Sequence, residues 1–201
     1  MNKGLIAIVG YKGTGKTTAA DHLVAAHGFY KVKFAEPLKE MLRTMGLTER
    51  HLEGDLKEVP CDLLGGKTPR HAMQTLGTEW GRDIMDPDLW VRVWYEKVQF
   101  LIEDKCKVVV DDLRFPNELK ALHALGGYIF LINSQLRIRQ PKDDHASEKV
   151  MQLMDQEEYI TLFNHGTVLD LKNDVDDLLL GKLPSTRQNP FMTEHNMARA
   201  S

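Results

Sequence analysis

Short apolar runs alternate with segments of helical periodicity along most of the chain. The helical segments place apolar residues three or four positions apart, and they cover residues 18–26, 38–46, 116–126 and 175–180. The apolar runs predict five strands, at residues 5–9, 30–34, 107–112, 128–132 and 166–171. Strands that alternate with helices in this way predict an α/β fold with a five-stranded parallel sheet and helices on both faces.

The second and third predicted strands are separated by a helical segment that is too long for a simple crossover. Within it, Thr68-Pro69 and Asp86-Pro87 are typical of helix starts. We therefore expect a helical, substrate-binding insertion at about residues 37–104, within a core of about residues 1–36 and 105–183. The polar residues 135–148 are predicted to form a lid, and residues 184–201 a loosely held tail.

The composition is that of an ordinary globular protein. Its 201 residues, 42% of them hydrophobic, favour one domain at residues 1–183, and a net charge of −3 provides no general attraction to nucleic acid or to a membrane. Cys61 and Cys106 lack the spacing of metal ligands, so neither a disulfide framework nor a zinc site is predicted. No apolar run is long enough to span a membrane, and the first strand begins almost at once. We expect a cytoplasmic protein with small-molecule partners. The sequence leaves open whether it forms a homodimer.

Residues 10–17 have the spacing of a phosphate-binding P-loop, in which a glycine is followed by four residues and then by Gly-Lys-Thr. A predicted strand precedes the motif and a predicted helix follows it. Glycines let successive N–H groups face phosphate oxygens, Lys16 can reach the β- and γ-phosphates, and the Thr17 hydroxyl can hold Mg²⁺. The predicted ATP-binding residues here are Gly10, Tyr11, Lys12, Gly13, Thr14, Gly15, Lys16, Thr17 and Thr18.

Two carboxylates end the strand that we expect beside the P-loop strand. Asp111 and Asp112 would then border the crevice in which such sheets bind ligands, and one of them would order Mg²⁺. A helix cap or a solvated pair is the alternative. Arg114 follows closely, and its planar guanidinium suits phosphate charge.

The insertion carries candidate acceptor-binding residues. Arg70 and Gln74 are four apart, so on one helix they share a face on which an arginine can clamp a phosphate and an amide can contact a base. Arg82 follows twelve residues after Arg70. Solvated surface side chains are the alternative for these positions. Trp80 falls in an apolar periodicity that favours the core, although its ring could instead stack on the acceptor.

Three further charged residues are candidates. Arg137 and Arg139 in the predicted lid could neutralise the charge of the transferring phosphate, or they could belong to a solvated basic loop. Glu36, just before Pro37, could face the acceptor, or it could be a carboxylate favoured by the dipole at a helix start.

Several motifs together resemble the bacteriophage deoxynucleoside monophosphate kinase family, one of the P-loop nucleoside monophosphate kinases. The narrowest of them are Leu76-Gly77-Thr78-Glu79-Trp80-Gly81-Arg82 and Asp112-Leu113-Arg114-Phe115-Pro116-Asn117-Glu118. The others are the P-loop, Phe34-Ala35-Glu36-Pro37-Leu38-Lys39, Thr68-Pro69-Arg70 through Gln74, and His145-Ala146-Ser147-Glu148. They occur in order over most of the chain.

The resemblance implies a P-loop NTPase three-layer α/β/α sandwich that transfers phosphate from ATP to a dNMP with Mg²⁺. It implies acceptor binding by Arg70, Gln74 and Arg82, and an active-site role for Glu36, Lys39, Asp112 and Arg114. One alternative is a P-loop kinase that acts on a hydroxymethylated pyrimidine in DNA or on another phosphorylated metabolite. Another is a nucleotide-dependent switch without phosphotransfer, although the chain has no Asn-Lys-x-Asp motif for guanine.

Overall fold

The computed structural model describes residues 4–133, 154, 159–164 and 166–182. The predicted lid at residues 135–148, with Arg137 and Arg139, and the tail at residues 184–201 lie outside these residues. The chain divides into two compact units. Unit 1 contains Met1–Lys31 and Gln99–Ser201, and unit 2 contains Val32–Val98.

Unit 1 is built on a five-stranded sheet with the order β2-β3-β1-β4-β5. Its strands are β1 (Leu5–Val9), β2 (Phe29–Lys31), β3 (Lys107–Val110), β4 (Tyr128–Asn133) and β5 (Ile160–Phe163). Every pair of neighbours is parallel, so all five strands end at the same edge of the sheet. The predicted five-stranded parallel sheet is confirmed, and β3 is the neighbour of β1, as expected.

The position of the fifth strand was predicted wrongly. Residues 166–171 contain the start of α8 (Val168–Leu179), whereas β5 precedes them. The Thr167 hydroxyl accepts a hydrogen bond from the Asp170 backbone N–H, and Asp170 Oδ2 accepts one from the Thr167 N–H at 2.7 Å. This reciprocal cap starts a helix in a segment whose apolar alternation resembles a strand.

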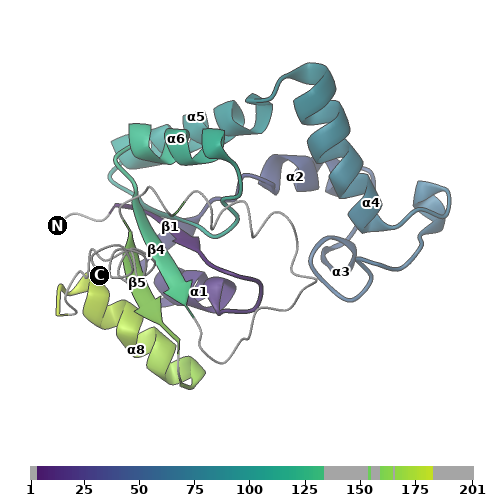
Figure 1. Cartoon of the computed structure of the whole chain (residues 1–201). Coiled ribbons are helices and arrows are strands. Elements are labelled where there is room, and N and C mark those ends of the chain that lie inside the picture. Colours follow the sequence, from purple (N-terminus) through teal and green to yellow (C-terminus); the bar gives the residue numbers. More distant parts are fainter. Residues whose placement is uncertain (1–3, 134–153, 155–158, 165, 183–201) are drawn as a thin grey trace, which may run out of the picture. The chain divides into compact units, whose positions relative to one another are not determined.

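Helices cover both faces of this sheet (Figure 1). On one face lie α1 (Lys16–His27) and α8, whose Leu23 and Leu171 are buried in one core cluster with Ile6 and Ile8 of β1. On the opposite face lies α6 (Pro116–Ala124), which buries Leu122. Successive residues of a strand point to opposite faces, and here both faces are covered by helices. All five residues of β1 are therefore apolar and buried.

Unit 2 is helical and has its own apolar core. Its elements are α2 (Glu36–Thr44), α3 (Glu49–Leu52), the 3₁₀ helix η1 (Asp62–Leu64), α4 (Pro69–Gln74), the π-helix η2 (Thr75–Met85) and α5 (Leu89–Glu103), which continues into unit 1. Leu38, Leu42, Leu47, Leu52 and Trp90 are buried together in this core. The core shows that residues 32–98 are more than a crossover between β2 and β3.

The helix that begins at Pro69 changes its winding after Gln74. From Thr75 to Met85 it is a π-helix, in which hydrogen bonds connect residues five positions apart. The buried indole of Trp90 lies against this segment, and its Nε1 donates to the Gly77 carbonyl oxygen at 2.8 Å. A Cβ on Gly81 would lie 2.5 Å from the same Nε1, so glycine is needed there. Helical periodicity alone did not predict this winding.

No helix in the described part of the chain has the length and the apolar content that a membrane crossing would require.

Candidate active site

The P-loop connects the end of β1 to the beginning of α1. Gly10, Gly13 and Gly15 have φ angles of 146°, 74° and 105°, a region that glycine adopts readily and other residues rarely do. A Cβ on Gly10 would lie 2.5 Å from the Ile132 carbonyl oxygen, and one on Gly15 would lie 2.7 Å from Leu171 Cδ2. The backbone conformation therefore favours glycine at all three positions, and close neighbours require it at Gly10 and Gly15 as well.

Two side chains of the loop are held by its own carbonyl groups. Lys16 Nζ donates to the carbonyl oxygens of Gly10 at 2.9 Å and Tyr11 at 2.7 Å, which holds the ammonium group against the loop. Thr14 is buried, and its hydroxyl donates to the Tyr11 oxygen at 2.9 Å, so this side chain shapes the loop. Lys12 and Thr17 are exposed.

Asn164 is a residue of this site that the sequence did not reveal. It directly follows β5, and its Nδ2 donates to the Thr14 carbonyl oxygen at 2.9 Å. Its own backbone N–H donates to the Asn133 carbonyl oxygen, which fixes it to the end of β4. An asparagine after a parallel strand is a usable signal, but the misplaced fifth strand concealed it.

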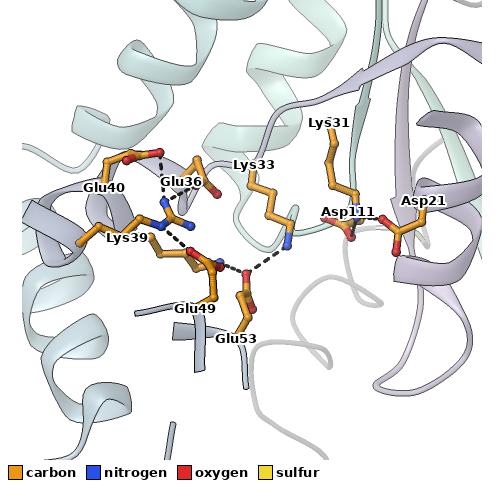
Figure 2. Close-up of polar contacts among 10 residues, drawn as sticks. Asp21, Lys31, Lys33, Glu36, Lys39, Glu40, Glu49, Glu53 and Asp111 are labelled. Atoms are coloured by element: carbon orange, nitrogen blue, oxygen red, sulfur yellow. Dashed lines mark hydrogen bonds and ion pairs between the residues drawn. The ribbon is translucent and has the colours of Figure 1, made fainter. Parts of the chain in front are cut away.

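Asp111 and Asp112 have different surroundings at the end of β3. Ala7 of β1 pairs with Val110, so both carboxylates follow β3 beside the strand that leads into the P-loop. Asp111 is buried and lies 3.3 Å from Lys31 Nζ, which also contacts Asp21 at 2.7 Å (Figure 2). Asp112 is half-buried. Of the two, Asp111 has the surroundings of a structural ion pair.

The backbone after Asp112 is fixed by a buried carboxylate. Glu118 of α6 is 2% exposed, and its Oε2 accepts hydrogen bonds from the N–H groups of Arg114 at 2.6 Å and Phe115 at 3.1 Å. These bonds satisfy two donors at a helix start and hold the turn that carries the exposed Arg114 side chain. Glu118 therefore fixes the backbone position of Arg114, a predicted site residue.

In unit 2, Lys39 and Glu53 form an ion pair at the buried end of the Lys39 side chain (Figure 2). Lys33 Nζ lies 3.2 Å from the same Glu53 oxygen. Burial by itself raises the pKa of Glu53, but the hydrogen bonds and charges of Lys39 and Lys33 outweigh it and lower this pKa to about 2. The Lys39 ammonium is thus held in place by a carboxylate that stays ionised at neutral pH.

Glu36 belongs to a second network in unit 2, around Arg43. Figure 2 labels the three carboxylates of this network, Glu36, Glu40 and Glu49. Arg43 Nη1 donates to Glu36 at 2.6 Å and lies 3.0 Å from Glu40, while Nε donates to Glu49 at 2.6 Å. The hydrogen bonds that Arg43 donates to Glu49 and Glu36 raise the pKa of Arg43, so it stays charged. Glu36 is therefore one of three carboxylates on one guanidinium, at the start of α2.

The other acceptor-binding candidates lie on α4 and η2. Arg70 and Gln74 are both exposed and share α4, as predicted from their spacing. Arg70 Nη1 lies 3.2 Å from Glu58. Arg82, on the π-helix, donates to the Pro87 carbonyl oxygen at 3.2 Å. Trp80 is 37% exposed, unlike the buried Trp90, and their ring centres lie 6.2 Å apart.

The structure thus gathers the predicted residues in two groups. Unit 1 holds the P-loop, Asp112 and Arg114 at one edge of its sheet, and unit 2 holds Glu36, Lys39, Arg70, Gln74, Trp80 and Arg82. Arg137 and Arg139 lie outside the described residues. The first group can bind a polyphosphate through main-chain amides and a lysine, and the second offers cations and an amide on helices.

Comparison with known proteins agrees with this chemistry. The model of a family described as deoxynucleotide monophosphate kinase matches residues 48–175. A protein of Acanthamoeba polyphaga mimivirus named "Putative deoxynucleotide monophosphate kinase" is 34% identical over 189 residues, which covers 85% of this chain and 93% of that protein. The uncharacterized protein ORF76 of Ictalurid herpesvirus 1 is 27% identical over 83% of this chain and 63% of its own length. Both of these relatives are viral, although neither comes from a bacteriophage.

Comparison with solved structures gives likenesses of low sequence identity. Dephospho-CoA kinase from Campylobacter jejuni is 13% identical with a TM-score of 0.48, over 88% of this chain and 96% of that one. Shikimate kinase from Aquifex aeolicus is 11% identical with a TM-score of 0.48, over 88% of this chain and 98% of that one.

Proposed function

The chain belongs to the deoxynucleotide monophosphate kinase family and is a kinase, and we propose that it transfers the γ-phosphate of ATP to a deoxynucleoside 5′-monophosphate, giving a dNDP and ADP. Donor binding is assigned to unit 1 and acceptor binding to unit 2. The free cysteines Cys61 and Cys106 suit a cytoplasmic setting for this reaction.

The donor site is the P-loop. Its positive-φ glycines turn main-chain N–H groups toward the phosphates, and the N-terminus of α1 adds a favourable dipole. Lys16 exchanges its contacts with the Gly10 and Tyr11 carbonyl oxygens for the β- and γ-phosphate oxygens of ATP. This exchange brings a positive charge to the bond that breaks.

The chemistry of the available ligands suits Mg²⁺. This cation prefers oxygen ligands, and the exposed Thr17 hydroxyl at the start of α1 and the Asp112 carboxylate after β3 supply them. Asp111 is the less suitable carboxylate, because it is buried against Lys31. When bound, Mg²⁺ would neutralise negative charge on the phosphates of ATP.

The acceptor site is assigned to Arg70, Gln74, Trp80 and Arg82, with Lys39 and Glu36. An arginine can bind the acceptor phosphate bidentately, and an amide four residues away on the same helix face can hydrogen-bond a base edge. Trp80 offers an exposed part of its ring for stacking. Arg82 is held at its helix by the Pro87 carbonyl oxygen, which limits its freedom before the acceptor binds.

The transfer itself needs positioning more than acid or base catalysis. An oxygen of the acceptor phosphate forms the new bond to the γ-phosphorus, while the bond from that phosphorus to the β–γ bridging oxygen breaks and ADP leaves. The attacking oxygen is already anionic, so it does not need to lose a proton. Lys16, Arg114 and a lid arginine, Arg137 or Arg139, neutralise the charge that spreads over the transferred group.

The observation that carries this proposal is the P-loop geometry in a chain of this family. The test is a panel in which ATP is incubated with each dNMP and each NMP, and ADP and the phosphorylated nucleotide are both quantified. We expect ADP and dNDP to form in equal amounts with at least one dNMP. Slow ADP formation without transfer would support a nucleotide-dependent switch, and transfer to DNA oligonucleotides alone would support the modified-pyrimidine acceptor.

A further inference from the structure

Within the described part of the chain, one group of side chains has the composition of a transition-metal site. His22 and His27 of α1 and Asp176 of α8 place one ligand atom each within 4.8 Å of one another. The P-loop chemistry uses none of these residues. A helix rises about 1.5 Å per residue, so His22 and His27 lie about 9 and 17 Å along α1 from Lys16.

The three ligand atoms converge on one point. His22 Nε2 lies 2.6 Å from Asp176 Oδ1, and His27 Nε2 lies 2.5 Å from the same oxygen. The two rings are nearly perpendicular, with centres 5.5 Å apart, so both present an edge nitrogen to the carboxylate. Residues that are 149 and 154 positions apart in the chain are thus brought to a single oxygen.

We propose that His22, His27 and Asp176 bind a divalent transition-metal ion such as Zn²⁺. Two imidazole nitrogens and one carboxylate oxygen form a ligand set that suits Zn²⁺, Co²⁺ or Ni²⁺ and does not suit Mg²⁺, which prefers oxygen ligands. The site is distinct from the Mg²⁺ site of the kinase reaction. Water completes the coordination, because the three side chains are 13%, 26% and 37% exposed.

Only a small rearrangement is needed for this binding. With bonds of about 2.0–2.1 Å to zinc, neighbouring ligands of a tetrahedral ion lie about 3.3 Å apart, so the present contacts open by about 0.7 Å. Both imidazoles bind through Nε2 as the neutral tautomer with the proton on Nδ1, and any Nε2 proton moves to Nδ1 or to solvent. A rotamer adjustment at the half-exposed Asp176 is sufficient for this opening.

The ion would fasten α8 to the helix that follows the P-loop. Leu171 of α8 lies near Gly15, at the beginning of α1, whereas Asp176 lies beside the second half of α1. A metal that binds both helices only in the folded state stabilises their packing. The effect is on the stability of unit 1 and leaves the chemical step of phosphate transfer unchanged.

The test uses the full chain without nucleotide, with ZnCl₂ and CoCl₂ as probes. We expect one ion per chain by calorimetry, a higher Tm with Zn²⁺ but not with Mg²⁺, and visible absorption bands of Co²⁺ bound to nitrogen and oxygen. His27→Ala and Asp176→Asn should each weaken Zn²⁺ binding at least about tenfold. His123→Ala, an exposed histidine of α6, is the matched control and should bind as the wild type does.

Zn²⁺ binding that is equal in His27→Ala, Asp176→Asn and the wild type would overturn the proposal and leave a hydrogen-bonded cluster. If the variants do not fold, ¹⁵N NMR of the wild-type imidazoles decides. Zn²⁺ should shift the Nε2 resonances of two histidines, and unshifted resonances would refute the site. Kinase activity with Mg²⁺ should be unchanged in folded variants, so this result is independent of the proposed reaction.

Discussion

Asn164 and Thr14 are 150 residues apart in the chain, yet Asn164 Nδ2 lies 2.9 Å from the Thr14 carbonyl oxygen. This hydrogen bond joins the end of β5 to the middle of the P-loop. Asn164 is itself held by the Asn133 carbonyl oxygen at the end of β4. The shape of the loop therefore depends on the far edge of the sheet as well as on its own glycines.

Asn164→Ala should loosen the P-loop. The Thr14 carbonyl oxygen loses its side-chain donor, and a typical loss of this kind costs about 1 kcal/mol of folding free energy. We expect a higher Kd for ATP by calorimetry and a lower urea midpoint. Asn173→Ala, an exposed asparagine on α8, is the control. Equal ATP affinity in both variants would show that the loop does not need this bond.

Lys16→Ala should abolish turnover and leave the fold intact. The ammonium group donates to the Gly10 and Tyr11 carbonyl oxygens of the loop and is not part of the apolar core, so its removal should leave that core packed. Loss of a group that stabilises developing phosphate charge should lower kcat at least about a hundredfold. The measurement is ADP and dNDP formation, with circular dichroism for the fold and Lys120→Ala, at an exposed position of α6, as the control. Undiminished turnover would remove Lys16 from the site.

Asp111→Asn and Asp112→Asn should have opposite phenotypes. Asp111 is buried 3.3 Å from Lys31 Nζ, so its neutralisation removes a buried ion pair and should cost about 1–3 kcal/mol of stability, although Asp21 still contacts the ammonium. Asp112→Asn should keep the stability and raise the Mg²⁺ concentration needed for half-maximal activity. Urea unfolding and a Mg²⁺ titration of both variants distinguish them. The reverse pattern would assign the metal to Asp111.

Acid should weaken unit 2 through Glu53. Its pKa is about 2 in the folded state against 4.5 ordinarily. The unfolded state therefore binds more protons between these values, and the stabilisation is complete above pH 4.5 and is lost as the pH falls toward 2. Because Glu53 is partly exposed and screened by solvent, we expect about 1 kcal/mol.

Glu53→Gln should flatten this part of the curve of unfolding free energy against pH. The measurement is urea unfolding at a series of pH values, with Glu103→Gln on α5 as the control. Other carboxylates with lowered pKa values, such as Asp170 and Asp86, also titrate in acid, so the informative quantity is the difference between variant and wild type. Parallel curves would show that the Lys39–Glu53 pair does not stabilise the fold.

Gly81→Ala should disturb the π-helix and the proposed acceptor-binding residues on it, Trp80 and Arg82. The new Cβ would lie 2.5 Å from Trp90 Nε1, and overpacking of this kind costs about 1–3 kcal/mol. In steady-state kinetics, we expect the KM for the dNMP to rise more, relative to the wild type, than the KM for ATP. Thr78→Ala, at an exposed position of the same helix, serves as the control. Similar increases in both KM values would mean that the π-helix does not serve the acceptor specifically.

The parts of the fold that the sequence predicted are those that local physics determines. Residues 5–27 form an apolar strand, a glycine-rich loop and a helix, and each of these is determined by residues within its own segment. The prediction of the fifth strand was wrong because Thr167 and Asp170 cap a helix in a segment whose apolar residues alternate as in a strand. The π-helix was not predicted because Trp90, which donates to the Gly77 carbonyl oxygen, lies outside the segment whose periodicity was analysed.

The same division applies to the candidate site. The P-loop and the Asp112 segment were predicted as site residues from their motifs and from the order of strands. Their supports are tertiary contacts between distant segments, namely Asn164 behind the loop and Lys31 beside Asp111. Glu118 was visible as part of a motif, but its role in fixing the Arg114 backbone required the structure.

Strands β2 and β3 are direct neighbours, with Phe29 opposite Lys107, and Val32–Val98 is inserted between them in the chain. A parallel pair of this kind needs only one covering helix as its connection. The remainder of unit 2 can therefore be exchanged, lengthened or redesigned while the order of strands stays the same. With acceptor binding in unit 2, as proposed, evolution or an engineer can change which molecule receives the phosphate and keep the P-loop sheet unchanged.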